Sequence, residues 1–271
     1  MIKKLLKILY ILMWVVLTAG LFALLGYTIE EHNYTICKKV IIQIDYGKSD
    51  TLISKTDILD ILKQTGNRLK GQSIGYINFE KIEKELGKQP YVAHAEVYNS
   101  LEGIVEIDVV QRQPILRIFN QRNESYYLDV NGNVLPINPA FSARVLVANG
   151  YITEPYIKNI SYSQDSIRKK DSIFYHSIML NLYKVAHYIM NNKFLKAQIE
   201  QIYVDKTGEF ELFPRVGNNI IVFGNAEEME KKFERLVIFY KNGLSKTGWN
   251  KYNVINIKYH NQVVCSKITS K

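Results

Sequence analysis

The chain has 271 residues, of which 47% are hydrophobic and 23% charged, and these proportions are typical of a globular protein rather than a disordered one. Its formal net charge of +9 would fit a nucleic-acid partner, but the basic residues are scattered among acidic ones. The charge therefore indicates a solvated basic surface, and we expect no nucleic acid as a partner.

The first predicted element is a membrane-spanning helix over Ile8–Ile29, a segment that contains no charged residue. A helix of this length, rising about 1.5 Å per residue, covers a hydrocarbon core of about 30 Å. Ile8, Trp14, Leu21 and Ile29 mark this predicted membrane anchor. A cleaved signal peptide is the alternative, but its apolar core would be shorter and would end at a small-residue cleavage site.

The charges on either side of this segment predict its orientation. Lysines at positions 3, 4 and 7 precede it, whereas Glu30 and Glu31 follow it. Because basic residues beside a span stay in the cytoplasm, we expect a short cytoplasmic stub and an exported domain. In a cell with an outer membrane the exported domain would lie in the periplasm.

The first part of the exported region predicts a small α/β domain. A strand is expected at Val40–Asp45, and a helix begins near Ser54 with an acidic residue in its first turn. A second helix begins after Asn78, which is a good N-cap residue. Strands at Ala93–Tyr98 and Ile104–Val110 follow. Two amphipathic helices on one face of a three-stranded sheet would bury a complete small core.

Beyond Pro114 the pattern becomes mostly β. The segment Tyr151–Lys170 is polar and weakly patterned, and is expected to be a loop. Strands are predicted at Ile115–Phe119, Tyr126–Val130, Val134–Leu135, Arg144–Ala148, Ile199–Val204, Glu209–Phe213, Ile220–Phe223, Val254–Tyr259 and Gln262–Cys265.

Two helices are predicted among these strands, at Ser172–Asn191 and Ala226–Lys241, because apolar residues recur there at helical spacing. Two pairs of residues four apart, Glu227 with Lys231 and Glu228 with Lys232, are expected to support the outer face of the second helix as ion pairs. The Gly-rich segment Asn242–Gly248 follows this second helix.

The residues indicate no catalytic constellation. Gly71–Gly75 matches G-x-S-x-G, but the nucleophile elbow needs a strand before Ser73 and a helix directly after it. His176 and His187 would share a helix face but would lie too far apart for one metal ion. We therefore predict that the protein is not an enzyme, and we expect no catalytic, cofactor-binding or metal-binding residue.

The two cysteines, Cys37 and Cys265, form no C-x-x-C motif, and nothing in the sequence brings them together. We expect two independent residues. Cys265 belongs to the last predicted strand, Gln262–Cys265. If that strand lies at a sheet edge, it presents unpaired backbone groups to an extended peptide. Periodicity alone leaves open whether it is an edge strand or a central one.

Four stretches in order resemble motifs of the FtsQ/DivIB family of bacterial division proteins. Pro90–Val97 resembles the family's PYV-x-x-A-x-V stretch, and Val105–Arg112, followed by Pro114, resembles its next strand and closing proline. Tyr127–Val134 is similar to its D-x-x-G hairpin. Ile255–Tyr259 is similar to its IDLRY strand, with Asn in place of Asp and Lys in place of Arg.

The resemblance implies an α+β fold: an N-terminal transmembrane helix, a small POTRA domain of β-α-α-β-β order, and a mostly antiparallel β domain with two helices packed on the sheet. The implied organisation is a cytoplasmic stub (1–7), a transmembrane helix (8–29), a linker (30–39), the POTRA domain (40–113), the β domain (114–266) and a tail (267–271).

The resemblance also implies a function. Members of this family are non-enzymatic inner-membrane scaffolds of the division complex that bind FtsB- and FtsL-type partners during septum formation. Carried over by position, the contact falls on Lys258, Tyr259, Gln262, Val263, Val264, Cys265 and Ser266. Two other hypotheses remain: a POTRA-containing factor for transport or outer-membrane biogenesis, and an extracytoplasmic hydrolase that uses Ser73.

Overall fold

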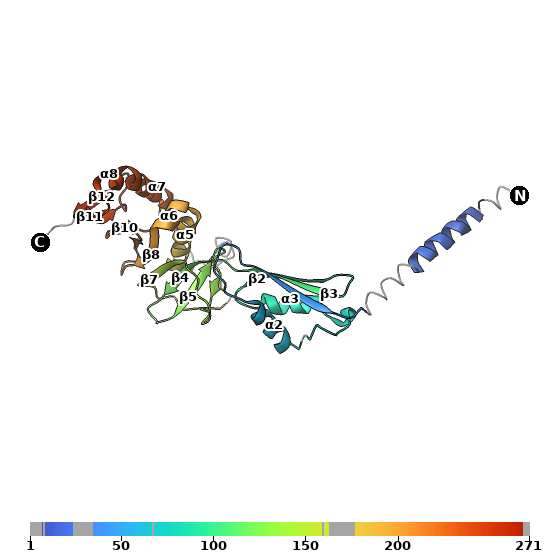
Figure 1. Cartoon of the computed structure of the whole chain (residues 1–271). Coiled ribbons are helices and arrows are strands. Elements are labelled where there is room, and N and C mark those ends of the chain that lie inside the picture. Colours follow the sequence, from blue (N-terminus) through green and yellow to red (C-terminus); the bar gives the residue numbers. More distant parts are fainter. Residues whose placement is uncertain are drawn as a thin grey trace. The chain divides into compact units, whose positions relative to one another are not determined.

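A computed structural model describes residues 7, 9–23, 35–66, 68–158, 160–162 and 177–267 of the chain (Figure 1). The chain divides into two compact units. Unit 1 comprises Met1–Asp45 and Ile53–Gln111, and unit 2 comprises Tyr46–Leu52 and Arg112–Lys271. Each unit has its own cluster of buried apolar side chains.

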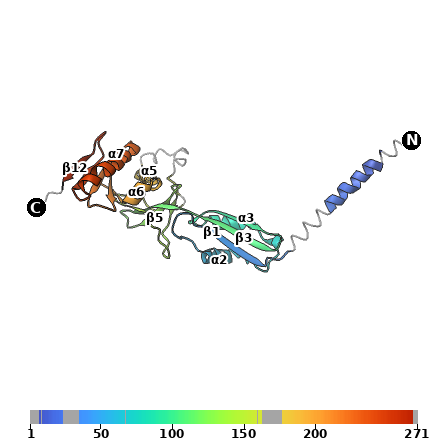
Figure 2. The same cartoon turned by 45° about the horizontal axis from the view of Figure 1, so that its top comes forward.

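Unit 1 contains a three-stranded sheet with strand order β1-β3-β2 (Figure 2). Strand β3 (Ile104–Gln111) lies in the centre, parallel to β1 (Lys39–Asp45) and antiparallel to β2 (Val92–Asn99). The helices α2 (Lys55–Gln64) and α3 (Phe79–Gly87) contribute their buried residues to the same core as the sheet, so both pack on one of its faces.

Local hydrogen bonds explain where these two helices begin. Ser54 and Asp57 form a reciprocal capping box: the Asp57 amide donates to Ser54 Oγ (3.2 Å) and the Ser54 amide donates to Asp57 Oδ2 (2.8 Å). At α3, the Lys81 amide donates to Asn78 Oδ1 (2.8 Å). Both N-caps agree with the residues expected from the sequence.

Unit 2 is built on a nine-stranded sheet with strand order β12-β11-β10-β9-β8-β7-β4-β5-β6. Most neighbouring strands are antiparallel, but β4–β7, β7–β8 and β10–β11 are parallel pairs. The strands are β4 (Pro114–Phe119), β5 (Ser125–Asp129), β6 (Val134–Leu135), β7 (Leu146–Gly150), β8 (Ile199–Val204), β9 (Phe210–Pro214), β10 (Ile220–Gly224), β11 (Tyr252–Asn256) and β12 (Val264–Lys267).

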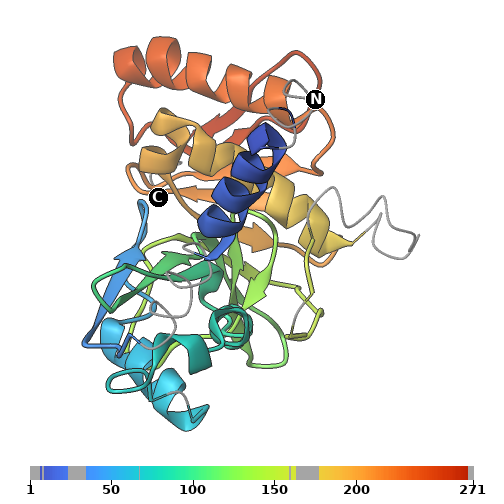
Figure 3. The same ribbon diagram turned by 90° about the vertical axis from the view of Figure 1, so that its right-hand side faces the viewer.

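One face of this sheet carries the core. Ile118, Ala148, Ile202 and Leu212 are aligned across neighbouring strands by their register, and all four are fully buried. Residues of α5 (Ile178–Asn191), α6 (Lys193–Gln198) and α7 (Met229–Phe239) join the same cluster, so these helices cover that face (Figure 3).

The structure differs from the expected fold of unit 2 in two places. Helix α6 was not predicted. The helix expected to end near Lys241 is followed by further helical residues, because a π-helix at Tyr240–Leu244 and a short helix α8 at Ser245–Thr247 continue from α7. In the segment Tyr151–Lys170, residue 159 and residues 163–170 lie outside the described part.

Helix α5 begins at Ile178, where Ser177 Oγ accepts from the Met179 amide at 3.1 Å. The earlier part of the predicted helix Ser172–Asn191, up to residue 176, lies outside the described residues. The described parts of Tyr151–Lys170 contain no helix or extended strand, only an isolated bridge between Ser161 and Asn133.

Candidate protein-interaction edge

The last strand, β12, lies at one end of the nine-stranded sheet. Within the described part of the chain its single strand neighbour is β11, with Asn256 opposite Val264 and Val254 opposite Ser266. Strand β11 lies between β12 and β10. One side of β12 is therefore open to an additional strand.

The register of β11 shows which backbone groups of β12 face this open side. The Ile257 amide donates to Val222 O of β10 (3.0 Å), so Ile255 and Ile257 turn their backbone groups toward β10. Asn256, between them, turns its groups toward β12 and forms a hydrogen-bonded pair with Val264. Because these pairs alternate along an antiparallel ladder, the N–H and C=O of Cys265 face the open side.

Side chains on β12 alternate in the same way. Cys265 lies opposite the fully buried Ile255 and packs against the core of unit 2, and this burial raises the pKa of its thiol. Val264, 46% exposed, and Ser266 lie on the solvent face. Cys265 and Cys37 are both free thiols.

Side chains of helix α7 and its N-cap bind the connection between β11 and β12. Arg235 Nη2 donates to the carbonyl oxygens of Ile257 (3.1 Å) and Tyr259 (3.2 Å). At the N-cap of α7, Glu228 Oε2 lies 3.0 Å from His260 Nδ1. These contacts fix the backbone that leads into the edge strand, so the edge depends on the docking of α7.

Lys258 is tied to the β8–β9 hairpin. Its Nζ donates to Glu209 Oε2 at 2.7 Å, and this bond to the carboxylate raises the pKa of Lys258. Its aliphatic stem covers Gly224, where an added Cβ would lie 2.9 Å from Lys258 Cγ. A residue that carries a side chain at position 224 would displace the Lys258 stem.

The seven residues that the resemblance placed at a partner contact do not all lie in one strand. Val264, Cys265 and Ser266 lie in β12, whereas Gln262 and Val263 precede it and Lys258 and Tyr259 follow β11. The strand expected over Val254–Tyr259 ends earlier, at Asn256, so Tyr259 lies beyond it. Its side chain is 51% exposed, because β11 ends at Asn256 and the chain turns where Asn256 Oδ1 accepts from the Lys258 amide (3.0 Å).

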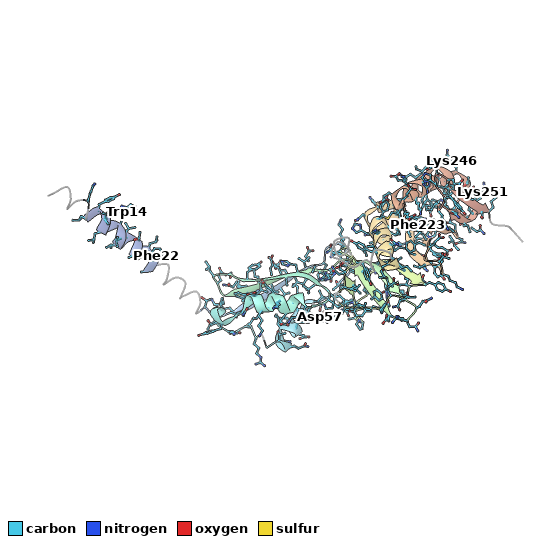
Figure 4. The ribbon with its side chains drawn as sticks, turned by 180° about the vertical axis from the view of Figure 1, so that it is seen from behind. Trp14, Phe22, Asp57, Phe223, Lys246 and Lys251 are labelled. Carbon is cyan, nitrogen blue, oxygen red and sulfur yellow. The ribbon has the colours of Figure 1, made fainter. Side chains whose placement is uncertain are left out.

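The predicted membrane-anchor residues are partly described. Trp14 and Leu21 belong to a helix over residues 9–23, in which they are 50% and 56% exposed, and Figure 4 shows Trp14 and Phe22 projecting from it. Ile8 and Ile29 lie outside the described residues. Among the described residues, no helix combines the length and apolarity that a membrane crossing requires.

Ser73 does not lie in a nucleophile elbow. It pairs with Ile36 in an isolated β-bridge and is followed by a 3₁₀ turn, Ile74–Tyr76, rather than an α-helix. In unit 2, a cavity of about 310 Å³ is lined by Arg144, Val145, Leu146, Met190, Lys196, Ile199, Glu200 and Arg215, which include no hydroxyl, thiol or imidazole. Among the described residues, no group of three or more His, Cys, Asp or Glu side chains could hold a metal ion.

The region that contains this edge matches a known protein family. A family model described as FtsQ/DivIB, C-terminal related matches residues 113–266, which is more than half of the chain. The chain belongs to this family. The matched region ends within β12, so it includes most of the edge strand.

Two further comparisons agree with the FtsQ/DivIB assignment. A model described as a POTRA-like domain matches residues 35–110. The chain is also 23% identical over 227 residues to the cell division protein FtsQ of Geotalea daltonii, and this alignment covers 83% of the chain and 75% of that protein. Membership of the FtsQ/DivIB-related family indicates a role in cell division.

Sequence reasoning missed the residues that support the edge. Arg235 and Glu228 lie on a different element from the carbonyls and the imidazole that they contact. Arg235 follows Glu234 in a mostly charged stretch of α7, so the local sequence carries no signal of its contact with distant carbonyl groups.

Proposed function

We propose that this chain is a non-enzymatic scaffold of the bacterial division complex that binds an extended segment of an FtsB- or FtsL-type partner along β12. The chain would be anchored in the inner membrane by a single N-terminal helix, with its N-terminus in the cytoplasm and its C-terminal domain in the periplasm at the septum. Family membership supports the division role, and the composition of the N-terminal segment supports the anchor.

The observation that carries the proposal is the open side of β12. A partner strand would pair with the N–H and C=O of Cys265, while Val264 and Ser266 would remain bonded to β11. Of the residues expected to bind the partner, Gln262, Val263, Lys258 and Tyr259 would contribute side-chain contacts beside this ladder.

The test is a pair of substitutions at Cys265 in the full chain. Cys265→Pro removes the outward N–H, whereas Cys265→Ala shortens the same side chain and keeps the N–H. We expect Cys265→Pro to weaken binding of the extracytoplasmic segment of an FtsB-type partner by about ten-fold, equivalent to about 1.4 kcal/mol. Cys265→Ala should bind nearly as the parent does. Equal affinities for a folded Cys265→Pro variant and the parent would refute pairing at this edge.

The POTRA-like match also favours a second function, a transport or outer-membrane biogenesis factor that binds substrate strands. Depletion in cells distinguishes the two. Filaments without septa would support the division scaffold, whereas normal septa with a loss of outer-membrane proteins would support the second function.

A further inference from the structure

Three strongly exposed apolar side chains gather at one end of unit 1. Leu101 is 83% exposed, Tyr76 78% and Ile36 54%. In the described part of unit 1, outside the helix over residues 9–23, no other large apolar side chain is more than 43% exposed. Single exposed apolar residues are ordinary, but a group of them marks an interaction surface.

Backbone contacts bring these three residues together. Ile36 pairs with Ser73, and the Ile74 amide donates to Thr35 O (2.9 Å) at the start of the turn that carries Tyr76. On the other side, the Lys38 amide donates to Gly103 O (2.8 Å), which places the turn containing Leu101 beside the same segment. Figure 1 shows both turns at the same end of unit 1.

Gly103 allows the turn that contains Leu101 to lie close to the backbone of Ile36. It has φ of +82°, and an added Cβ would lie 2.6 Å from Ile36 O. The buried neighbours Cys37 and Ile74 hold the segment on the core, so the side chains of Ile36 and Tyr76 are directed outward. The patch is therefore part of the folded unit.

Basic residues lie on the backbone segments that carry the patch or contact it. Lys38, Arg68 and Lys70 are exposed, and within the described part of the chain none of the three forms an ion pair. Glu102 is the exposed acidic residue beside Leu101. Exposed apolar side chains with such cations on the same segments fit the interface of an anionic bilayer, where apolar groups enter the acyl boundary and cations contact headgroups.

The chain reaches the patch directly from the apolar N-terminal segment. Residues 24–34 separate the helix over residues 9–23 from Thr35, and a chain of that length spans at most about 40 Å. If the N-terminal segment crosses the membrane, the end of unit 1 that carries Ile36 is the end held near the bilayer.

We propose that Ile36, Tyr76 and Leu101 form a lipid-docking patch that rests on the anionic membrane surface. This inference rests on the membrane anchoring given under the proposed function. The patch gives unit 1 a second attachment to the bilayer, and thereby restricts how the exported domain is oriented above it.

The test uses the full chain in vesicles of phosphatidylcholine and phosphatidylglycerol. In a Cys265→Ser background, an environment-sensitive fluorophore is attached at Leu101→Cys or Tyr76→Cys; Cys37 is fully buried and should not label. The matched control is Lys55→Cys, an exposed position at the start of α2. It lies two residues after Ile53, whose amide donates to Gln111 Oε1 at the end of β3 opposite the turn that contains Leu101. Flotation with the vesicles first establishes that the chain is anchored.

We expect blue-shifted emission at positions 101 and 76, and roughly halved intensity when the lipids carry a quencher, with neither effect at position 55. Replacing Lys38 and Lys70 by Glu should reverse the shift while flotation is retained. Anchored chains whose labels at 101 and 76 behave as at 55 would overturn the patch. A blue shift without lipid quenching would also overturn it, since a protein surface would then cover these residues. Loss of flotation would instead contradict the anchor.

Discussion

At the scale of single residues, Lys232 was predicted to lie on the surface, but its side chain is buried. The sequence predicted an ion pair between Glu228 and Lys232 on the outer face of the helix, and this is wrong. Lys232 is only 6% exposed, and its Nζ donates to Asn225 O (2.9 Å) and Asn225 Oδ1 (3.0 Å), 5.1 Å from the centre of the Phe223 ring. Glu228 pairs with Lys231 instead (2.6 Å).

Burial lowers the pKa of Lys232 from its ordinary value of 10.5. The unfolded chain therefore binds more protons than the folded chain between these two pKa values, and stability contributed by this residue rises with pH across that window. We expect the stability difference between the parent and Lys232→Met to shift in favour of the parent as pH rises toward 10.5. Urea unfolding of both chains at several pH values measures this, and parallel stability curves would contradict it.

Residues whose contacts are local were the ones that the sequence revealed. Ser54 and Asp57 bond to each other, and Asn78 bonds three residues ahead, so their helix starts follow from spacing alone. Arg235 bonds to carbonyls 22 and 24 residues away, and no local pattern encodes that distance. The edge strand was predictable as a strand, but its supports were not.

At the scale of elements, α7 determines whether the β11–β12 connection is ordered. Arg235→Ala would remove the two hydrogen bonds that Nη2 donates to the carbonyls of Ile257 and Tyr259, and should cost about 1–3 kcal/mol of stability. We expect faster amide exchange over residues 257–263, measured by hydrogen–deuterium exchange. Glu234→Ala, at an exposed position on the same helix, is the control and should leave this exchange unchanged. Equal exchange in the two variants would show that α7 does not support the connection.

Helices were predicted where the apolar stripe was long and were missed where it was short. Helix α6 has only six residues, fewer than two turns, which is too short for periodicity to identify. The π-helix at Tyr240–Leu244 was hidden by Gly243, which suggests a loop. An added Cβ at Gly243 would lie 2.8 Å from the Phe239 side chain, so the glycine serves close packing within a continuous helical run.

At the scale of the whole molecule, the sequence predicted most strands but not their order. The parallel pairs β4–β7, β7–β8 and β10–β11 join strands that are distant in the chain. Alternation of apolar residues shows which face of each strand is buried. The alternation does not depend on the order of the strands, so it cannot predict that order. The position of β12 at the end of the sheet therefore required the structure.

Separate cores predict separate responses to core mutations. Ile82 is fully buried in the core of unit 1, so Ile82→Ala should destabilise that unit by about 2–5 kcal/mol. We expect faster hydrogen exchange over residues 79–111 and unchanged exchange over residues 199–256. Leu59→Ala, at a 39% exposed position on α2, is the milder control. Equal acceleration in both regions would show that the units unfold together.

The shortness of β12 has a consequence for how durable a bound partner could be. The strand has four residues, and by alternation two of them, Cys265 and the terminal Lys267, turn their backbone groups outward. Each hydrogen bond in such a ladder contributes only about 1 kcal/mol net, so backbone pairing alone would give a short residence time. A long residence time would require side-chain contacts beside the ladder. A complex of this kind can dissociate and re-form without unfolding of either protein.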